Sequence, residues 1–485
     1  MSRVLKAIAN HAQKTPEAIA LGSSNQTFTY AALRDEIALT AGRLLALTAL
    51  VRPGAPVAVV LENSPAWVIL DLALVQLGWP SLPLPGFFTQ AQRDHALADA
   101  GAGLLISAAD DATAASIKVA GTMLSVTPLA TPAARLPAGT AKITYTSGST
   151  GQPKGVCLSQ DQMESVAGSL VEVIGQDYAG RHLPVLPLAI LLENVAGLYT
   201  TLLAGGRYHV LSPAELGLDN PFRPDFMRLA SVIDGEGATS LILVPELLRA
   251  LLMLMTFTGV RFPKLDLVAV GGAKVSPKLL EQAATAGLPV FEGYGLSECA
   301  SVVALNTPAA RKVGAVGRPL PHLKVEISQN GEVLVGPRPF LGYAGGAENA
   351  GEVRTGDLGR IDEQGYLHID GRRSSTIINA YGRNIAPEWV EAELLAQPEI
   401  RQAIVFGEAQ SELGALIVPL TPEVGEPAVA AAIARANQNL PAYAQVRRWR
   451  LREPFDPAAG ELTGNGRPRR AALLARHRDF IEASE

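Results

Sequence analysis

The chain has 485 residues, of which 48% are hydrophobic and 18% charged, with a formal net charge of −5. That length exceeds what one hydrophobic core normally serves, so we expect two or more domains. The small acidic charge gives no reason to expect a nucleic-acid partner. Cys157 and Cys299 have no metal or redox spacing, and the first residues lack an apolar signal core. Both features favour a reducing cytoplasm.

The first 370 residues or so alternate β-rich runs with helical stretches, which predicts parallel sheets covered by helices. We expect strands at 56–61, 141–144, 240–244, 265–270 and 289–291, and helices at 64–77, 245–255 and 276–286. Ser64 and Pro65 are typical of a helix N-cap and first position. The apolar run 69–77 contains Asp71 and is too short to span a membrane.

The character of the sequence changes near Gly371. Before it, 332–335 and 366–369 resemble short antiparallel strands. After it we expect helices at 387–395 and 427–439, strands at 402–406 and 414–419, and a basic tail. The chain is therefore predicted to be an α/β protein. Its large N-terminal domain of helix-covered sheets is residues 1–371, and its small mobile C-terminal α+β domain is residues 372–485.

A polar loop at 145–155 follows the strand predicted at 141–144. It contains three glycines, four aliphatic hydroxyls and one lysine, and its candidate ligand residues are Thr146, Ser147, Gly148, Ser149, Thr150, Gly151 and Lys154. Glycines let backbone N–H groups close on an anion, while hydroxyls and an ammonium donate to phosphate oxygens. The composition predicts a polyphosphate nucleotide. A polar surface linker explains it equally well, because the lysine spacing departs from the common phosphate loop.

The residue order of this loop resembles the signature loop of the adenylate-forming superfamily. That superfamily includes acyl-CoA synthetases, peptide-synthetase adenylation domains and luciferases. Further segments match its pattern in the expected order, at 269–273, 292–298, 354–359, and 369–374 together with 380–388. Each of the first three segments alone also fits an ordinary turn, and the last two stretches fit a solvated interdomain linker. The ordered set covers nearly the whole chain and favours a member close to long-chain acyl-CoA or acyl-AMP ligases.

The resemblance implies ATP and Mg²⁺ as cofactors and assigns roles around the phosphates. Tyr294 would stack on adenine, with Gly295 beside it. Ser297 stands where the family usually has threonine and would bond the phosphate or the substrate carboxylate. Glu298 would hold Mg²⁺, and Lys154 would contact the reacting phosphates.

The remaining segments are implied to hold the sugar and to move the small domain. Gly272 and Ala273 follow a strand, where backbone lets a base or ribose approach closely. Asp357 would accept both ribose hydroxyls, and Arg372 would contact ribose and phosphate. Ser374 falls at the family's hinge position, which is commonly Asp or Lys. The segment 381–386 resembles the wall of the thiol tunnel.

One departure concerns the catalytic lysine that the family carries near its C-terminus. Arg467 occupies that position, and the last lysine of the chain is Lys324. Arginine keeps the positive charge but does not reproduce a compact ammonium. An alternative interpretation of this exchange is that the adenylation step is impaired and the chain is a degenerate member of the family.

The expected substrate is a small apolar carboxylic acid, fatty or aryl. Residues 186–195 resemble the acyl-pocket segment of long-chain acyl-CoA synthetases, with Ile190 in place of a histidine and no aspartate for a substrate ammonium. The acyl adenylate would pass to CoA or to the phosphopantetheine of an acyl carrier protein. A different second step, or nucleotide binding with little turnover, remains an alternative.

Overall fold

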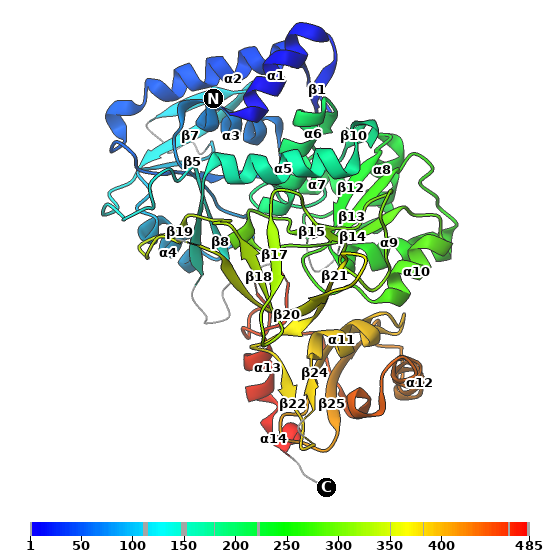
Figure 1. The fold of residues 1–485 in the computed structure, drawn as a ribbon. Helices are drawn as coiled ribbons and strands as arrows, with labels where there is room; N and C mark the ends of the chain where they lie inside the picture. The colour runs from blue at the N-terminus through cyan, green and yellow to red at the C-terminus, as the bar shows by residue number, and fades with distance from the viewer. Residues whose placement is uncertain are drawn as a thin grey trace.

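The computed structural model describes residues 2–109, 115–146, 153–178, 180–220, 224–349, 351–381, 383–463 and 466–482. Two large sheets and their helices form one body, and a smaller body with α11 to α14 lies below it in Figure 1. The large body matches the predicted helix-covered sheets, and the small one the predicted α+β domain.

The first large sheet has the strand order β19-β9-β8-β4-β3-β5-β7-β6 in the described residues. Its strands are β3 (Val57–Val60), β4 (Ser81–Pro83), β5 (Leu104–Ala108), β6 (Ser116–Val119), β7 (Thr122–Pro128), β8 (Lys142–Thr146), β9 (Lys154–Leu158) and β19 (Gly342–Tyr343). The inner pairs β3–β4 and β3–β5 are parallel, whereas β8 and β9 are antiparallel. The described ends of this last hairpin are Thr146 and Lys154, so the polar loop of the sequence connects β8 to β9.

The second large sheet has the order β16-β15-β14-β13-β12-β10-β11-β1-β2 within the same described part. Its strands are β1 (Ile19–Gly22), β2 (Thr27–Thr29), β10 (Arg181–His182), β11 (Arg207–His209), β12 (Ser240–Leu243), β13 (Leu267–Val270), β14 (Val290–Tyr294), β15 (Ala304–Leu305) and β16 (Arg318–Pro319). The central pairs β12–β13 and β13–β14 are parallel, as predicted, and neither pair shows a register shift. Their carboxyl ends therefore lie at one edge, where α/β proteins bind ligands.

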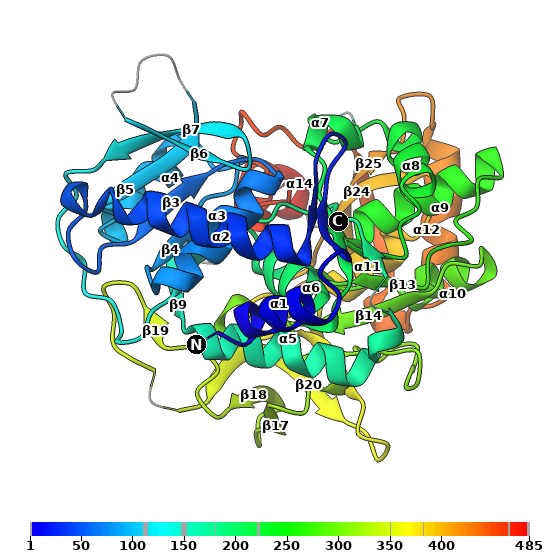
Figure 2. The same cartoon turned by 90° about the horizontal axis from the view of Figure 1, so that it is seen from above.

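Helices cover both sheets. They are α1 (Arg3–Lys14), α2 (Tyr30–Leu45), α3 (Pro65–Leu77), α4 (Gln90–Asp99), α5 (Gln160–Ile174), α6 (Thr200–Ala204), α7 (Pro213–Leu216), α8 (Phe226–Gly235), α9 (Pro245–Thr258) and α10 (Pro277–Thr285). The Ser64 hydroxyl accepts a hydrogen bond from the Trp67 amide at the start of α3, which confirms the predicted cap. Figure 2 shows α2 and α3 packed on one face of the first sheet. Among the described helices, none has the length and apolarity to cross a membrane.

A third sheet of antiparallel pairs carries the segments that precede the small body. It contains β17 (Lys324–Ile327), β18 (Glu332–Gly336), β20 (Val353–Ile361) and β21 (Leu367–Arg372). The two strands predicted before Gly371 are thus β18 and β21, and β20 lies between them. This arrangement places Asp357 and Arg372 opposite one another on neighbouring strands.

The small body has its own hydrophobic core. Its elements are β22 (Ile377–Ile378), β23 (Asn384–Ile385), α11 (Pro387–Leu395), β24 (Ile400–Phe406), β25 (Leu413–Pro419), α12 (Glu426–Asn437), β26 (Val446–Leu451), α13 (Arg470–Arg476) and α14 (Arg478–Glu482). The prediction of a basic tail was wrong, because β26 pairs in parallel with β25 and two helices follow. These elements were missed because arginines in the sequence suggest a solvated segment. In the structure, however, the Arg452 side chain donates a hydrogen bond to the buried carboxylate of Glu461.

Candidate active site

A cavity of about 2100 Å³ opens at the carboxyl edge of the central strands and is lined from both bodies. The large body contributes the ends of β13 and β14, and the small body contributes the segment that leads into α13. The lining includes Lys154, Gly272, Tyr294, Gly295, Ser297, Glu298, Arg372 and Arg467. Eight residues predicted from separate motifs thus meet at one cavity.

The glycine turn after β13 is shaped for close approach. Gly272 has φ of +84°, a conformation that residues with a Cβ rarely adopt. A Cβ on Gly271 would lie 3.1 Å from the Gly293 carbonyl oxygen. The turn therefore presents bare backbone to the cavity. Ala273 follows it and is exposed.

Lys154 and Glu298 lie on two sides of one tyrosine. Lys154 Nζ is 5.6 Å from the centre of the Tyr343 ring, and the Tyr343 hydroxyl donates a 2.9 Å hydrogen bond to Glu298 Oε1. Burial, with the Glu298 charge as a smaller cause, raises the pKa of Tyr343, so it stays a hydrogen-bond donor. Sequence reasoning missed Tyr343, because Gly342 and Tyr343 belong to none of the matched segments. The structure recruits it by pairing β19 with β9.

The sugar-binding candidates form a hydrogen-bonded group around Asp357. The Tyr294 hydroxyl donates to Asp357 Oδ2 at 2.6 Å, and Arg372 Nε donates to Oδ1 at 2.9 Å. Burial, followed by the nearby Asp357 charge, raises the pKa of Tyr294. Both oxygens of the carboxylate thus already have a protein donor. Because each carboxylate oxygen accepts more than one hydrogen bond, the arrangement still leaves acceptor capacity for hydroxyls.

Arg467 joins the small body to the glycine turn. Its Nη2 atom donates a 2.6 Å hydrogen bond to the carbonyl oxygen of Gly272. The Thr463 amide donates to the Arg467 carbonyl at 2.7 Å, which closes the turn that carries the arginine. The Arg467 guanidinium therefore lies at the glycine turn and lines the cavity.

The loop residues predicted to bind phosphate are outside the described part of the chain: Ser147, Gly148, Ser149, Thr150 and Gly151. Thr146 ends β8, next to that loop.

Among the described residues there is no cluster of three His, Cys, Asp or Glu side chains for a metal ion. Glu298 is the residue predicted to hold Mg²⁺, and a single carboxylate is compatible with that prediction, because Mg²⁺ is commonly held by one or two carboxylates together with substrate phosphates and waters.

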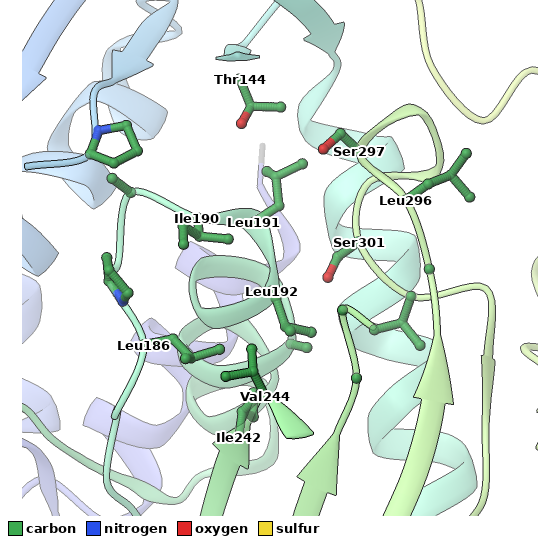
Figure 3. A pocket seen from close by; sticks show the side chains of 18 of the residues that line it. Thr144, Leu186, Ile190, Leu191, Leu192, Ile242, Val244, Leu296, Ser297 and Ser301 are labelled. Carbon is green, nitrogen blue, oxygen red and sulfur yellow. The ribbon is translucent and has the colours of Figure 1, made fainter. Parts of the chain in front are cut away.

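The deeper part of the cavity is apolar. Figure 3 shows the side chains of Leu186, Leu192 and Ile242 gathered at one end, with Thr144 and Ser297 at the other. Leu192 begins a π-helix that runs to Tyr199. Such helices are rare and frequently occur at functional sites.

A buried ion pair holds this π-helix against the first sheet. Lys142 Nζ, from β8, lies 2.7 Å from Asp71 Oδ1 in α3 and 2.5 Å from Asn194 Oδ1 in the π-helix. The Tyr199 hydroxyl donates to Asp71 Oδ2 at 2.8 Å. Burial lowers the pKa of Lys142, and the Asp71 charge opposes that shift. The sequence signal was Asp71 within an apolar run, but its partner was not identifiable from the sequence.

Comparison with known proteins identifies the family. The model of the AMP-binding enzyme family matches residues 8–343, and that of the AMP-binding enzyme C-terminal domain matches residues 374–484. A feruloyl-CoA synthase from an Amycolatopsis species is 30% identical over 442 residues, which cover 84% of this chain and 87% of that protein.

Two solved structures have the same fold. One is the O-succinylbenzoate coenzyme A synthetase from Bacillus subtilis in complex with ATP and magnesium ion, with a TM-score of 0.75 and 25% identity over 96% of this chain and 98% of that one. The other is an amide bond synthetase from Marinactinospora thermotolerans, with a TM-score of 0.75 and 24% identity over 98% of each chain.

Proposed function

This chain belongs to the AMP-binding enzyme family, within the adenylate-forming superfamily, and we propose that it activates an apolar carboxylic acid as an acyl adenylate and passes the acyl group to a thiol. The observation that carries the proposal is the convergence of Lys154, Glu298 and Arg467 on one cavity whose deep end is apolar. Cationic and carboxylate groups at one end suit ATP and its metal, and aliphatic groups at the other suit an acyl chain.

In the proposed first step, the substrate carboxylate attacks the α-phosphorus of ATP and pyrophosphate leaves. Lys154 and Arg467 offset the charge that develops on the phosphates. Mg²⁺, when bound by Glu298, would neutralise phosphate charge. Tyr343 holds the Glu298 carboxylate in place.

We assign the sugar to the group around Asp357, with Tyr294 and Arg372 as the neighbours that orient it. Ser297 is assigned to the phosphate or the substrate carboxylate, and the backbone at Gly272, Ala273 and Gly295 to the base or ribose. Residues 147–151 are assigned to the phosphates.

Coenzyme A is the proposed acceptor, because the relatives include a feruloyl-CoA synthase and an O-succinylbenzoate coenzyme A synthetase. The phosphopantetheine of an acyl carrier protein remains a prediction. For the second step we take residues 1–371 and 372–485 as domains that rotate about a hinge at Ser374. A transfer to an amine is the second candidate, since a protein of the same fold is an amide bond synthetase.

Pyrophosphate release with a panel of fatty and aryl acids tests the proposal. We expect release with at least one acid, and an acyl-CoA product when CoA is added. Adenylate without thioester would favour an amine acceptor. ATP binding without release from any acid would indicate a degenerate member and overturn the proposal.

A further inference from the structure

A chain of buried polar side chains lies beside the apolar end of the cavity, where an acyl pocket needs none. Ser240 and His182 line the cavity, and the Ser240 hydroxyl lies 2.9 Å from His182 Nδ1. His182 Nε2 lies 2.9 Å from Glu193 Oε1, which also accepts a 3.0 Å hydrogen bond from the Tyr208 hydroxyl. Glu193 and Tyr208 are 0% exposed.

The carboxylate fixes the direction of this chain. Because a carboxylate only accepts hydrogen bonds, His182 Nε2 carries a proton and is the donor of the hydrogen bond to Glu193. When the imidazole carries only that proton, Nδ1 is an acceptor, and the Ser240 hydroxyl is then the donor of the Ser240–His182 hydrogen bond. The Ser240 oxygen keeps its lone pairs and is an acceptor toward the cavity.

The strand geometry directs Ser240 into the space that an acyl chain would fill. Side chains two residues apart on a strand share a face, and Figure 3 shows the Ile242 side chain in the cavity. Ser240 is three residues before Leu243, whose carbonyl accepts from Gly271 at the level of the glycine turn. At about 3.3 Å per residue, Ser240 lies about 10 Å below that turn.

On these observations we infer that the substrate is a hydroxy acid, whose hydroxyl donates a hydrogen bond to Ser240 at the deep end of the cavity. The inference rests on the proposed function and adds that the substrate carboxylate lies beside the Arg467 guanidinium, at the level of the glycine turn. An extended carbon chain advances about 1.25 Å per bond, from a C–C length near 1.52 Å and an angle near 111°. A span of about 10 Å therefore corresponds to about eight bonds between the carboxyl carbon and the hydroxyl oxygen.

The test compares pairs of acids that differ only in this hydroxyl. The alkyl pair is 8-hydroxyoctanoic and octanoic acid, and the aryl pair is 4-hydroxycinnamic and cinnamic acid. We expect the enzyme to prefer one hydroxy acid over its partner about five- to tenfold in kcat/KM for pyrophosphate release, which is the size of one net hydrogen bond. The pair that shows the preference identifies an alkyl or an aryl substrate.

Ser240→Ala should reduce this preference to about one, and His182→Gln should reduce it partly. The matched control is Ser301→Ala, because Ser301 also points into the cavity but its hydroxyl has no hydrogen-bond partner among the described residues. That variant should keep the preference. Ser240→Cys, which keeps the shape of the side chain but makes only weak hydrogen bonds, replaces Ser240→Ala if the alanine variant does not fold.

A preference that survives Ser240→Ala, or that Ser301→Ala abolishes, would overturn the inference. So would equal kcat/KM for both members of both pairs. Calorimetric binding of the same acids separates the two hypotheses. If no acid releases pyrophosphate, the proposed function fails, while tighter binding of a hydroxy acid that depends on Ser240 still supports this inference.

Discussion

Arg467 Nη2 lies 2.6 Å from the carbonyl oxygen of Gly272, 195 positions earlier in the chain. This contact places the arginine predicted to replace the family's lysine at the glycine turn after β13. Arginine reaches further than lysine and presents a planar fork, so it can bond the backbone and still offer N–H groups to the cavity.

The first prediction concerns this arginine. Arg467→Ala should slow adenylate formation by up to about 10²–10³-fold, the usual effect of losing one donor to a developing charge. ATP affinity should change little, because the donor acts mainly in the transition state. Single-turnover pyrophosphate release and ATP titration measure the two effects.

Arg447→Ala is the matched control, since that exposed arginine bonds Gln445 within the small body. Arg467→Lys tests whether arginine at this position slows the reaction or whether the surrounding residues are adapted to it. A higher rate would show that arginine carries a catalytic cost, and a lower rate that the surroundings have adapted to it. Unchanged turnover in Arg467→Ala would remove the residue from the mechanism.

A second prediction concerns Tyr343. Tyr343→Phe removes the 2.9 Å hydrogen bond to Glu298 but keeps the ring beside Lys154. Groups that orient metal ligands typically change metal affinity by about 10–100-fold when removed. We therefore expect about tenfold more Mg²⁺ for half-maximal pyrophosphate release. Tyr366→Phe, in a buried tyrosine elsewhere in the large body, should not change this requirement.

The third prediction concerns the buried Lys142–Asp71 pair. Lys142→Met leaves the Asp71 carboxylate, itself 4% exposed, without its cation. Removing one partner of a buried pair typically lowers the free energy of unfolding by about 3–5 kcal/mol. Urea unfolding measures the loss. The double variant Lys142→Met/Asp71→Leu should recover much of it, and equal loss in both variants would contradict this account.

The sequence predicted the helix start and the glycine turn near the site, but not the side-chain contacts that support the site. Ser64 with Pro65 marked the start of α3, and the glycines after β13 marked the turn, because caps and tight turns depend on local chemistry. Tyr343 and Lys142 were missed, since their roles arise from pairing of distant strands. The π-helix from Leu192 to Tyr199 has no local signal comparable to a cap.

The C-terminal elements show a different cause of failure. The end of the chain was predicted to be a basic tail because arginines cluster at 447–452 and again at 467–478. In the structure Arg452 and Arg476 both bond Glu461, which is 1% exposed. Charge pattern alone cannot distinguish a solvated face from arginines paired to a buried carboxylate.

The fourth prediction concerns the pose of the small body. Arg249, on α9, donates through Nη1 to the Leu395 and Ile400 carbonyls at 2.6 and 2.7 Å. These bonds hold the small body in the pose that brings Arg467 to Gly272. Arg249→Ala should slow adenylation by about tenfold, the size of one charged hydrogen bond, but spare thioester formation from preformed acyl adenylate.

Arg261→Ala is its control, since Arg261 bonds only carbonyls of its own body among its described partners. Both half-reactions are measured separately, by pyrophosphate release and by acyl-CoA formation. Equal slowing of the two half-reactions in Arg249→Ala would mean that Arg249 stabilises the fold and does not select a pose.

The fifth prediction concerns pH and His322, whose Nδ1 lies 2.8 Å from the Ser169 hydroxyl. Burial, with a smaller contribution from the Arg3 charge, lowers the pKa of His322 from 6.5 to about 4. Between these two values the unfolded chain binds a proton that the folded chain does not. The contribution of His322 to the free energy of unfolding is therefore most favourable above about pH 6.5, and it declines as the pH falls toward 4. Thermal unfolding at pH 7.5 and pH 5 should show a lower Tm at pH 5, and His322→Asn should reduce the difference. The same Tm difference in both proteins would assign the acid sensitivity to other groups.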